Sequence, residues 1–216
     1  QIMFSILMLA MMFIMVPRAQ AAAVRINEVL DTMPEITDPE KPQDTFTGKG
    51  HVEFKDVTFR YHGAEEPALK NISFDARPGE VTAIIGSTGS GKSSLVNLIP
   101  RFYDVENGSI QIDGVDVRDI SQESLRAKIG YVPQQAVLFS GSIDDNIRFG
   151  KDEADEGEIE KAAEIAQAME FITEMDDGFA HEVSQGGTNV SGGQKQRLSI
   201  ARALVRKPEV YIFDDS

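Results

Sequence analysis

The sequence predicts an α/β protein built on a mostly parallel sheet, and three observations support this class. Strand-like apolar runs alternate with runs of helical spacing along residues 46–216. A glycine-rich loop, residues 86–93, lies between an apolar strand-like run and a helical run. A further short apolar run, residues 210–213, ends in two aspartates. Strands that alternate with helices form parallel sheets, because a parallel return requires a crossover connection.

Composition limits the class of partner. The 216 residues include 21 Lys plus Arg and 35 Asp plus Glu, which gives a net charge of −14. Nucleic acid is therefore not expected as a partner, because phosphate backbones require a basic face. The chain has no cysteine, which excludes disulfides and thiolate metal sites and agrees with a reducing compartment. It begins at Gln1 and ends just past an acidic pair, so we interpret it as a fragment of a longer protein.

Residues 2–16 form one uncharged apolar run. As a helix they span about 22 Å, whereas a bilayer core is about 30 Å thick. We interpret the run as the second half of a transmembrane helix whose start is missing. Five methionines lie in it, and such pliable side chains suit either a wall that binds varied apolar ligands or a lipid-facing surface.

Two alternatives apply to this segment. A signal peptide has a similar apolar core, and Ala19-Gln20-Ala21 mimics a cleavage site, but there is no basic n-region and no initiator Met. A buried helix of a soluble domain is the other alternative. Arg18 and Arg25 follow the run, which favours a cytoplasmic location for the residues after it.

Three segments follow from this pattern. Residues 1–30 are expected to be the end of the transmembrane helix and its cytoplasmic extension, because helical spacing continues to Leu30. Residues 31–45, with three prolines among polar residues, are expected to be a linker. The main domain is expected over residues 46–216.

The main domain carries recognisable strand and helix patterns. Residues 52–61 alternate as a strand with an irregularity at Asp56, and an Asp113-Gly114 turn predicts a hairpin over residues 108–117. The other expected strands are 69–74, a buried strand at 81–85 that leads into the glycine-rich loop, 129–134, and a buried strand at 210–213. The expected helices are 158–171 and 194–205, with loops at 151–157 and 176–191.

The loop at residues 86–93 matches G-x-x-x-x-G-K-S, a phosphate-binding pattern. Its glycines are expected to permit positive φ, so that backbone N–H groups converge on an anion. The helix that starts near Lys92 adds its positive dipole end. Lys92 is expected to reach the outer phosphates and the Ser93 hydroxyl to hold Mg²⁺. The predicted nucleotide contacts here are Gly86, Ser87, Thr88, Gly89, Ser90, Gly91, Lys92, Ser93 and Ser94.

Two further features complete a nucleotide site. Asp214, at the end of an apolar strand, can hold Mg²⁺ through water opposite Ser93. Residues 191–194, Ser-Gly-Gly-Gln, open a second helix whose free N–H groups can bind an anion. One ATP needs only one such helix start, so the second is expected to close over a nucleotide held by another subunit. The alternative is a simple helix cap at Ser191.

The set formed by residues 86–93, Gln134, residues 191–194 and Asp214 resembles the nucleotide-binding domain of ATP-binding cassette (ABC) transporters, over residues 46–216. Residues 1–45 resemble the last transmembrane helix and linker of exporter half-transporters. The resemblance implies a P-loop NTPase core with an antiparallel β subdomain and a helical subdomain. It implies ATP and Mg²⁺ as cofactors, and a second half-transporter subunit, a lipid membrane and a transported, hydrophobic small molecule as partners. The domain would lie on the cytoplasmic side of the plasma or inner membrane.

The resemblance also implies roles for individual residues. Tyr61 matches the aromatic residue that stacks on adenine, although an ordinary strand aromatic is the alternative. Gln134 matches the residue that senses Mg²⁺ and the attacking water. Ser191, Gly192 and Gly193, with Gln194, would contact the γ-phosphate of ATP bound to the other subunit. Residues 182–183 resemble the exporter segment that touches the partner's coupling helix.

The sequence departs from the family pattern at the general base. Asp215 stands where the family has Glu, and a misplacement of about 1 Å can lower a rate about 100-fold. Val190 replaces the usual Leu before the Ser-Gly-Gly-Gln segment, and none of His51, His62 and His181 matches the family's switch histidine. We therefore expect one half of a heterodimeric exporter whose own site hydrolyses poorly, in a fragment that is inactive alone. A soluble or importer ABC ATPase and a regulatory ATP-binding subunit are the alternatives.

Overall fold

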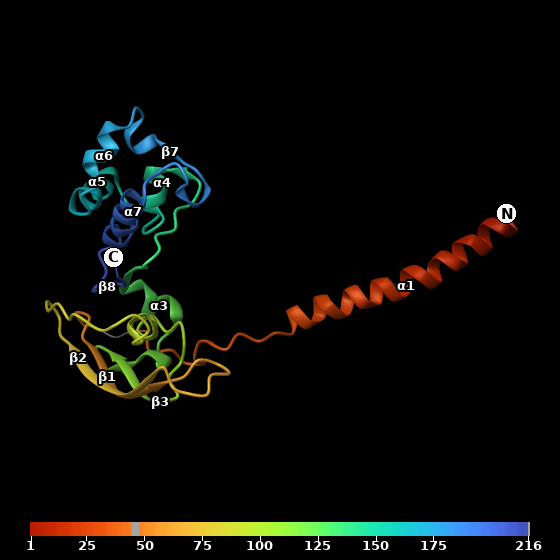
Figure 1. Cartoon of the computed structure of the whole chain (residues 1–216), viewed down its shortest axis with the longest axis horizontal. Helices are drawn as coiled ribbons and strands as arrows, with labels where there is room; N and C mark the ends of the chain where they lie inside the picture. Colours follow the sequence, from red (N-terminus) through yellow and green to blue (C-terminus); the bar gives the residue numbers. More distant parts are fainter. Residues whose placement is uncertain (45–47, 216) are drawn as a thin grey trace. The chain divides into compact units, whose positions relative to one another are not determined.

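The computed structural model describes residues 1–44 and 48–215. The chain divides into two units, Gln1–Thr37 and Asp38–Ser216. The first unit is dominated by one long helix, and the second contains every described strand and the remaining helices (Figure 1).

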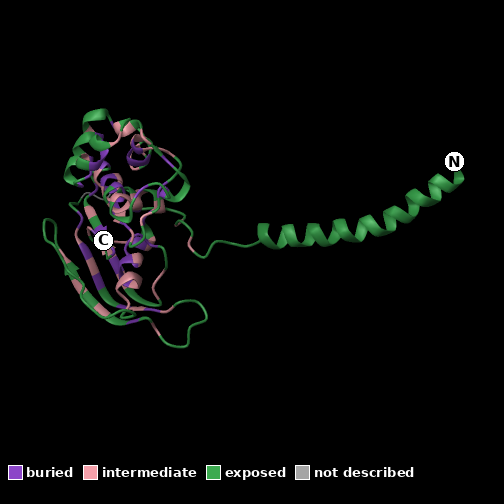
Figure 2. Ribbon diagram, turned by 45° about the horizontal axis from the view of Figure 1, so that its top comes forward, coloured by how far each residue is buried: buried purple, intermediate pink, exposed green. Residues whose placement is uncertain are grey.

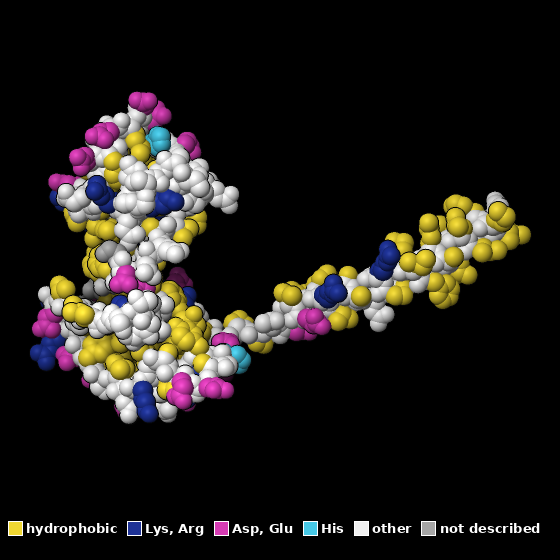
Figure 3. Space-filling model, in the orientation of Figure 1, with side chains coloured by type: hydrophobic (Ala, Val, Ile, Leu, Met, Phe, Trp, Pro, Cys, Tyr) yellow, Lys and Arg dark blue, Asp and Glu magenta, His cyan; other side chains and the backbone are white. Residues whose placement is uncertain are grey.

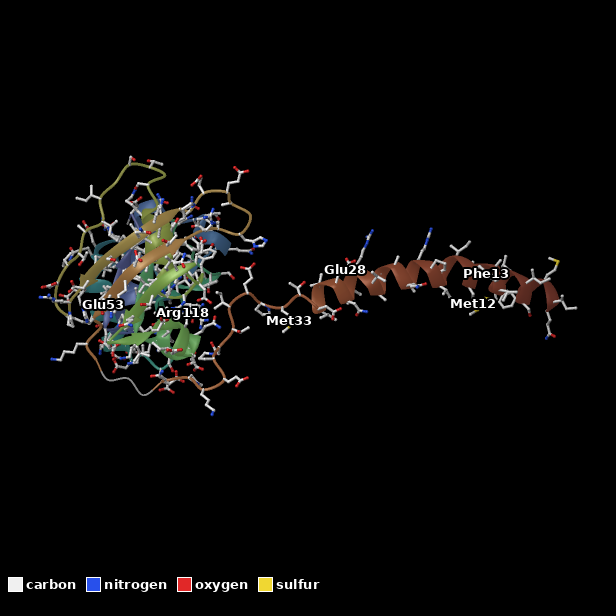
Figure 4. The ribbon with its side chains drawn as sticks, turned by 90° about the horizontal axis from the view of Figure 1, so that it is seen from below. Met12, Phe13, Glu28, Met33, Glu53 and Arg118 are labelled. Carbon is white, nitrogen blue, oxygen red and sulfur yellow. The ribbon has the colours of Figure 1, made fainter. Side chains whose placement is uncertain are left out.

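Helix α1, Ile2–Leu30, continues through Pro17, so the end of the apolar run is not the end of the helix. None of its residues is buried in the described structure (Figure 2). Met12 and Phe13 project from it into open space (Figure 4). Apolar side chains cover its N-terminal part, and its charged side chains lie nearer the linker (Figure 3). By length and composition α1 could cross a membrane, a test that signal sequences also pass.

A four-stranded antiparallel sheet has the order β2-β1-β3-β4, formed by Leu69–Ala76, Val52–Phe59, Asn107–Ile112 and Val115–Asp116. Alternation places Val52, Phe54 and Phe59 in the core. The expected irregularity at Asp56 is confirmed: the register between β1 and β2 shifts between Phe54 and Val57, and Asp56 has φ 50°.

The predicted hairpin is also confirmed. Strands β3 and β4 are joined by Asp113 and Gly114, whose φ angles are 53° and 85°. A two-residue turn with positive φ at both positions fits the twist of the strands, which is why Asp-Gly is favoured there. The Asp113 carboxylate also accepts hydrogen bonds from the N–H groups of Gly50 and His51.

A parallel pair forms the second sheet. Strand β5, Ile129–Val132, pairs with β8, Val210–Phe213, in a register that runs from Ile129 opposite Val210 to Val132 opposite Phe213. The carboxyl ends of both strands therefore emerge at the same edge.

The prediction of a buried strand at residues 81–85 is wrong. This run lies outside any strand, and Val81 and Ile85 are 98% and 94% exposed. A strand requires a ladder of backbone hydrogen bonds, and among the described residues β8 is paired with β5 alone. For the same reason β8 is not fully buried as expected, since Tyr211 and Phe213 are exposed.

The helices after β5 are α4 (Ile143–Arg148), α5 (Glu156–Ile165), α6 (Met169–Glu174) and α7 (Gly192–Val205). One helix was predicted over residues 158–171, but the structure has two, because Gln167 is left-handed at φ 56°. The predicted loop 176–191 contains two 3₁₀ turns, Gly178–Ala180 and Gln185–Gly187, and strand β7, Glu182–Val183, which pairs with β6, Gly141–Ser142.

Buried apolar residues form two cores in the second unit. Buried segments are purple in Figure 2. One lies between the antiparallel sheet, α2 (Lys92–Leu98), α3 (Gln122–Ala127) and the parallel pair. The other lies among helices α4 to α7. The fold is thus mixed α/β with an antiparallel sheet, as predicted. The expected mostly parallel sheet is not found among the described strands, because β5 and β8 are the one pair that runs parallel and residues 81–85 add no strand beside them. The candidate site residues are divided between the two cores.

Candidate functional site

The glycine-rich loop adopts the backbone that its glycines allow. Gly89 and Gly91 have φ 83° and 91°, and Gly91 immediately precedes α2 as its N-cap. Gly86 is not left-handed, contrary to expectation. Its small size matters instead, because a Cβ atom there would lie 2.4 Å from Ser90 Oγ. The loop is therefore tight at both ends, through backbone conformation at one and close approach at the other.

Lys92 is folded over this loop. Its Nζ donates to the carbonyl oxygens of Gly86 at 3.1 Å and Ser87 at 3.3 Å. An ammonium group has three donors and no acceptor, so it can bridge loop carbonyls and a neighbouring anion. The positive charge lies beside the N–H groups at the start of α2, and the two together suit a phosphate.

Ser93 meets Asp214, the residue that the sequence predicted to lie opposite it. The Ser93 hydroxyl donates to Asp214 Oδ1 at 2.9 Å across 121 positions of sequence. Asp214 is 8% exposed, and its N–H donates to Val132 O, which continues the β5–β8 ladder. The parallel pair therefore sets the carboxylate against the first turn of α2.

These two side chains fit a magnesium ion. Mg²⁺ takes oxygen ligands and commonly binds one or two protein groups together with waters and substrate phosphates. No cluster of three or more His, Cys, Asp or Glu capable of holding a metal occurs among the described residues. A hydroxyl and a single carboxylate beside a phosphate loop correspond to this sparse mode of binding.

Tyr131 lies beside this pair and was missed by sequence reasoning. Its hydroxyl donates to Asn97 Oδ1 at 2.9 Å, which links β5 to α2. Burial, together with the charge of Asp214, raises the pKa of Tyr131 to about 12. Nothing in its apolar-flanked strand position distinguishes it in the sequence, because its partner is 34 positions away.

We expect the Tyr131 hydroxyl to ionise late, near pH 12. Because the folded pKa is raised, its stabilising contribution is complete below the ordinary value of 10.0 and is lost as the pH rises toward about 12. Phenolate absorbance followed from pH 9 to 13 should show a late component that Tyr131→Phe removes. Persistence of that component in Tyr131→Phe, or its removal by Tyr103→Phe, would contradict the assignment.

Gln134 and Asp215 emerge at the same edge of the parallel pair. Gln134 follows β5 by two residues, and Asp215 follows β8 with φ 50°. Both are exposed, and neither makes a hydrogen bond to another described side chain. Their strands bring them toward the Ser93–Asp214 pair, while their side chains are left without fixed partners in residues 48–215.

Tyr61 is brought to the start of α2. Its hydroxyl lies 2.9 Å from Ser94 Oγ, and its ring packs edge-on against Phe59 and Tyr103. Tyr61 remains 38% exposed. An aromatic face is thus held beside the phosphate loop, although the predicted contact with adenine stays a prediction.

The Ser191 segment forms a helix cap. Ser191 Oγ accepts from the Gln194 N–H, and Gln194 Oε1 accepts from the Ser191 N–H at 2.8 Å, which is a complete capping box. Ser191 is therefore a helix cap, as the alternative interpretation of this segment predicted. Gly192 and Gly193 are exposed, and a Cβ atom at either would meet nothing within 4 Å. Among the described residues, no hydrogen bond joins residues 191–194 to residues 86–94.

Arg202, on the same helix, ties α7 to the chain beyond Gln134. Its guanidinium donates to the carbonyl oxygens of Asn146 and Val137 and to Asn146 Oδ1, at 2.8 to 2.9 Å. It also lies against the rings of Phe139 and Phe149. Sequence reasoning did not find this residue, because one arginine in a helical pattern carries no distinguishing signal.

Comparisons with known proteins agree with this arrangement. The family model described as ABC transporter matches residues 69–216. The chain is 47% identical over its whole length to an uncharacterised ABC transporter ATP-binding protein of Mycobacterium tuberculosis, and covers 38% of that protein. It is 46% identical over 94% of its length to the ATP-dependent lipid A-core flippase of Xanthomonas campestris, covering 34%. A solved bacterial Atm1-family ABC exporter with ATP bound superposes with a TM-score of 0.87 at 36% identity, over 94% of this chain and 36% of that one. The chain thus spans little more than a third of the relatives it matches.

Proposed function

Because this chain belongs to the ABC transporter family, we propose that it is the ATP-binding part of an exporter subunit that hydrolyses ATP to move an apolar, lipid-like molecule across a membrane. The observation that carries the proposal is the Ser93–Asp214 hydrogen bond, which joins the phosphate loop to the end of β8. The exporter-type relatives, one of them a lipid A-core flippase, support the membrane role and the substrate class.

The geometry supports the following proposed roles. Lys92 and the N–H groups of the loop bind the outer phosphates, and Tyr61 offers its ring to adenine. Ser93 and Asp214 would hold Mg²⁺, which neutralises charge on the phosphates. Gln134 would orient the attacking water and report the state of the site to the membrane part.

The second proposed element is a two-subunit site. Residues 191–194 begin α7, a helix of the second core, whereas the phosphate loop begins α2 in the first. Exposed N–H groups at Gly192 and Gly193 would contact the γ-phosphate of ATP held by a partner subunit. Binding of two nucleotides would then join two such domains, and hydrolysis would release them.

The domain division is part of the proposal. Residues 1–30 would be the end of a transmembrane helix and its extension, residues 31–45 a linker, and residues 46–216 the nucleotide-binding domain on the cytoplasmic side. The membrane would be the plasma or inner membrane.

The decisive experiment uses the full-length polypeptide, with its partner, in proteoliposomes. We expect vanadate-sensitive Mg-ATP hydrolysis and ATP-dependent transfer of a fluorescent phospholipid between leaflets. Hydrolysis in detergent without any requirement for membrane-spanning segments upstream of Gln1 would favour a soluble ABC ATPase. ATP trapping without turnover at either site would favour a regulatory subunit.

Asp215 is proposed to be a weak general base. Its side chain is one methylene shorter than Glu, and a displacement of about 1 Å at a reacting group can cost about 100-fold in rate. With the partner's base removed, Asp215→Glu in the full-length complex should raise single-site turnover by about 10- to 100-fold. Phosphate release under steady-state conditions measures it.

The matched control is Asp215→Asn, which should lower the residual rate further. If the unaltered chain with Asp215 already sustains the turnover of a normal site, the idea of a degenerate site fails.

A further inference from the structure

The segment between α1 and the antiparallel sheet is attached to helix α3. Asp38 Oδ1 accepts from the Gln122 N–H at 2.9 Å and from Gln122 Nε2 at 3.0 Å. Asp44 Oδ1 accepts from the Ser121 N–H at 3.0 Å and from Ser121 Oγ at 2.9 Å. Between these two aspartates, the Gln43 N–H donates to Asp119 O at 2.8 Å. Five hydrogen bonds therefore hold residues 38–44, which we call the anchor segment.

The anchor relies on charge as well as hydrogen bonding. Both carboxylates receive N–H groups at the start of α3, where the helix dipole is positive. The pKa of Asp38 lies below its ordinary value, mainly because Gln122 donates to it and also because Arg101 and Arg126 are nearby. Asp38 and Asp44 are exposed, so the fold of the second unit does not depend on burying them.

Helix α3 is in turn attached to two elements of the candidate nucleotide site, helix α2 and strand β5. Leu125 is fully buried in the first core. The Arg126 guanidinium donates to the carbonyl oxygens of Pro100 and Arg101, just after α2, the helix that starts at Lys92. On its other side α3 leads through Lys128 directly into β5, which delivers Gln134. A force applied at the anchor segment therefore acts on the C-terminal end of α2 and on β5.

The chain between α1 and the anchor is short. Helix α1 ends at Leu30, and the first anchoring side chain is Asp38, which leaves residues 31–37. Seven extended residues reach at most about 25 Å, and Pro34 stiffens the segment further. A displacement of the end of α1 beyond this reach must then be taken up at the anchor.

From these contacts we infer that Asp38 and Asp44 are positioning residues that transmit movement between α1 and the nucleotide site through α3 and β5. The inference rests on the proposed exporter function, because α1 must move when ATP binds. In this inference, movement passes from α1 to α3 through the continuous chain of residues 31–44, and no contact with another membrane segment is needed.

The test uses the full-length transporter in proteoliposomes. Spin labels are placed at Arg25→Cys on α1 and Glu160→Cys on α5, two exposed positions. Residues 1–216 contain no cysteine, and any cysteine elsewhere in the full-length transporter is first replaced by serine. Labelled subunits are diluted with unlabelled ones, and the distance distribution is recorded without nucleotide and after trapping with ATP and vanadate. Basal Mg-ATP hydrolysis is measured on the same samples.

The variant Asp38→Ala/Asp44→Ala is expected to reduce the ATP-dependent distance shift at least twofold and to broaden the distribution, with basal hydrolysis within twofold of the parent. The matched control is Glu35→Ala/Glu40→Ala, which removes the same charge. Glu35 and Glu40 are exposed and make no hydrogen bond or ion pair within the described part of the chain. Asp38→Asn/Asp44→Asn keeps an acceptor oxygen at each position and should restore at least half of the lost shift.

An unchanged shift in the alanine pair would overturn the inference. Loss of hydrolysis in step with the shift would also overturn it, because the anchor would then maintain the fold and not transmit movement. Absence of any ATP-dependent shift in the parent transporter is a separate result, which would count against the proposed exporter function itself.

Discussion

Replacing Lys92 by alanine in the full-length complex is expected to weaken ATP binding at this chain's own site by about 100-fold. Its ammonium lies over the loop carbonyls of Gly86 and Ser87, where it can reach a phosphate placed on the adjacent N–H groups. A hydrogen bond to a charged group contributes about 1.5 to 3 kcal/mol, and each 1.4 kcal/mol is about tenfold in affinity. Equilibrium binding of a fluorescent ATP analogue measures the change, and the number of tightly bound nucleotides per pair should fall by one for each altered chain.

The control for this substitution is Lys161→Ala. Lys161 is an exposed lysine of α5 that pairs with Glu164 across one turn of the helix. The Lys161→Ala substitution removes the same charge as Lys92→Ala and leaves the loop at residues 86–93 unchanged, so nucleotide binding should stay within twofold of the parent. If Lys92→Ala binds ATP as tightly as Lys161→Ala, the phosphate-binding role of this loop is wrong.

Gly192→Asp is expected to abolish turnover at the partner's site, with a loss of about 100-fold or more. The substitution places a carboxylate where the γ-phosphate of the partner's ATP would lie, and like charges at close range repel strongly in a site that excludes water. The fold should tolerate it, because a Cβ atom there meets nothing within 4 Å and an acidic residue in the first turn of α7 favours the helix dipole. Single-site turnover in the full-length complex, with this chain's own base removed, is the measurement.

Gly192→Asn is the matched control, since it has nearly the same size and no charge. Its turnover should exceed that of Gly192→Asp at least tenfold, and neither variant should alter ATP binding at this chain's Lys92. A loss of nucleotide binding at Lys92 caused by Gly192→Asp would show that both helix starts serve one ATP molecule, and the paired arrangement would be refuted.

Several elements were predictable because their cause is local. The Asp113-Gly114 turn requires only two residues that accept positive φ. The cap at Ser191 requires only a hydroxyl followed three residues later by Gln194. The irregularity at Asp56 follows from a break in the two-residue alternation.

Other elements depended on partners that no local pattern identifies. Residues 81–85 have the composition of a buried strand, yet they are exposed because no described strand pairs with them. The spacing at residues 158–171 is helical throughout, and the break at Gln167 arises where the chain turns left-handed between α5 and α6. Burial and pairing are properties of the assembled fold, so propensity could not decide them.

The sequence by itself determined which chemical groups this protein carries: a glycine-rich loop with a lysine and a serine at its end, an aspartate after a strand, and a second helix start that contains two glycines. Only the tertiary structure decided which of these groups meet, since Ser93 reaches Asp214 across 121 positions and Asp38 reaches Gln122 across 84. The physical reason is that residue type sets what a group can bind, whereas contacts between distant groups depend on burial and hydrogen bonding summed over the whole chain against its conformational entropy.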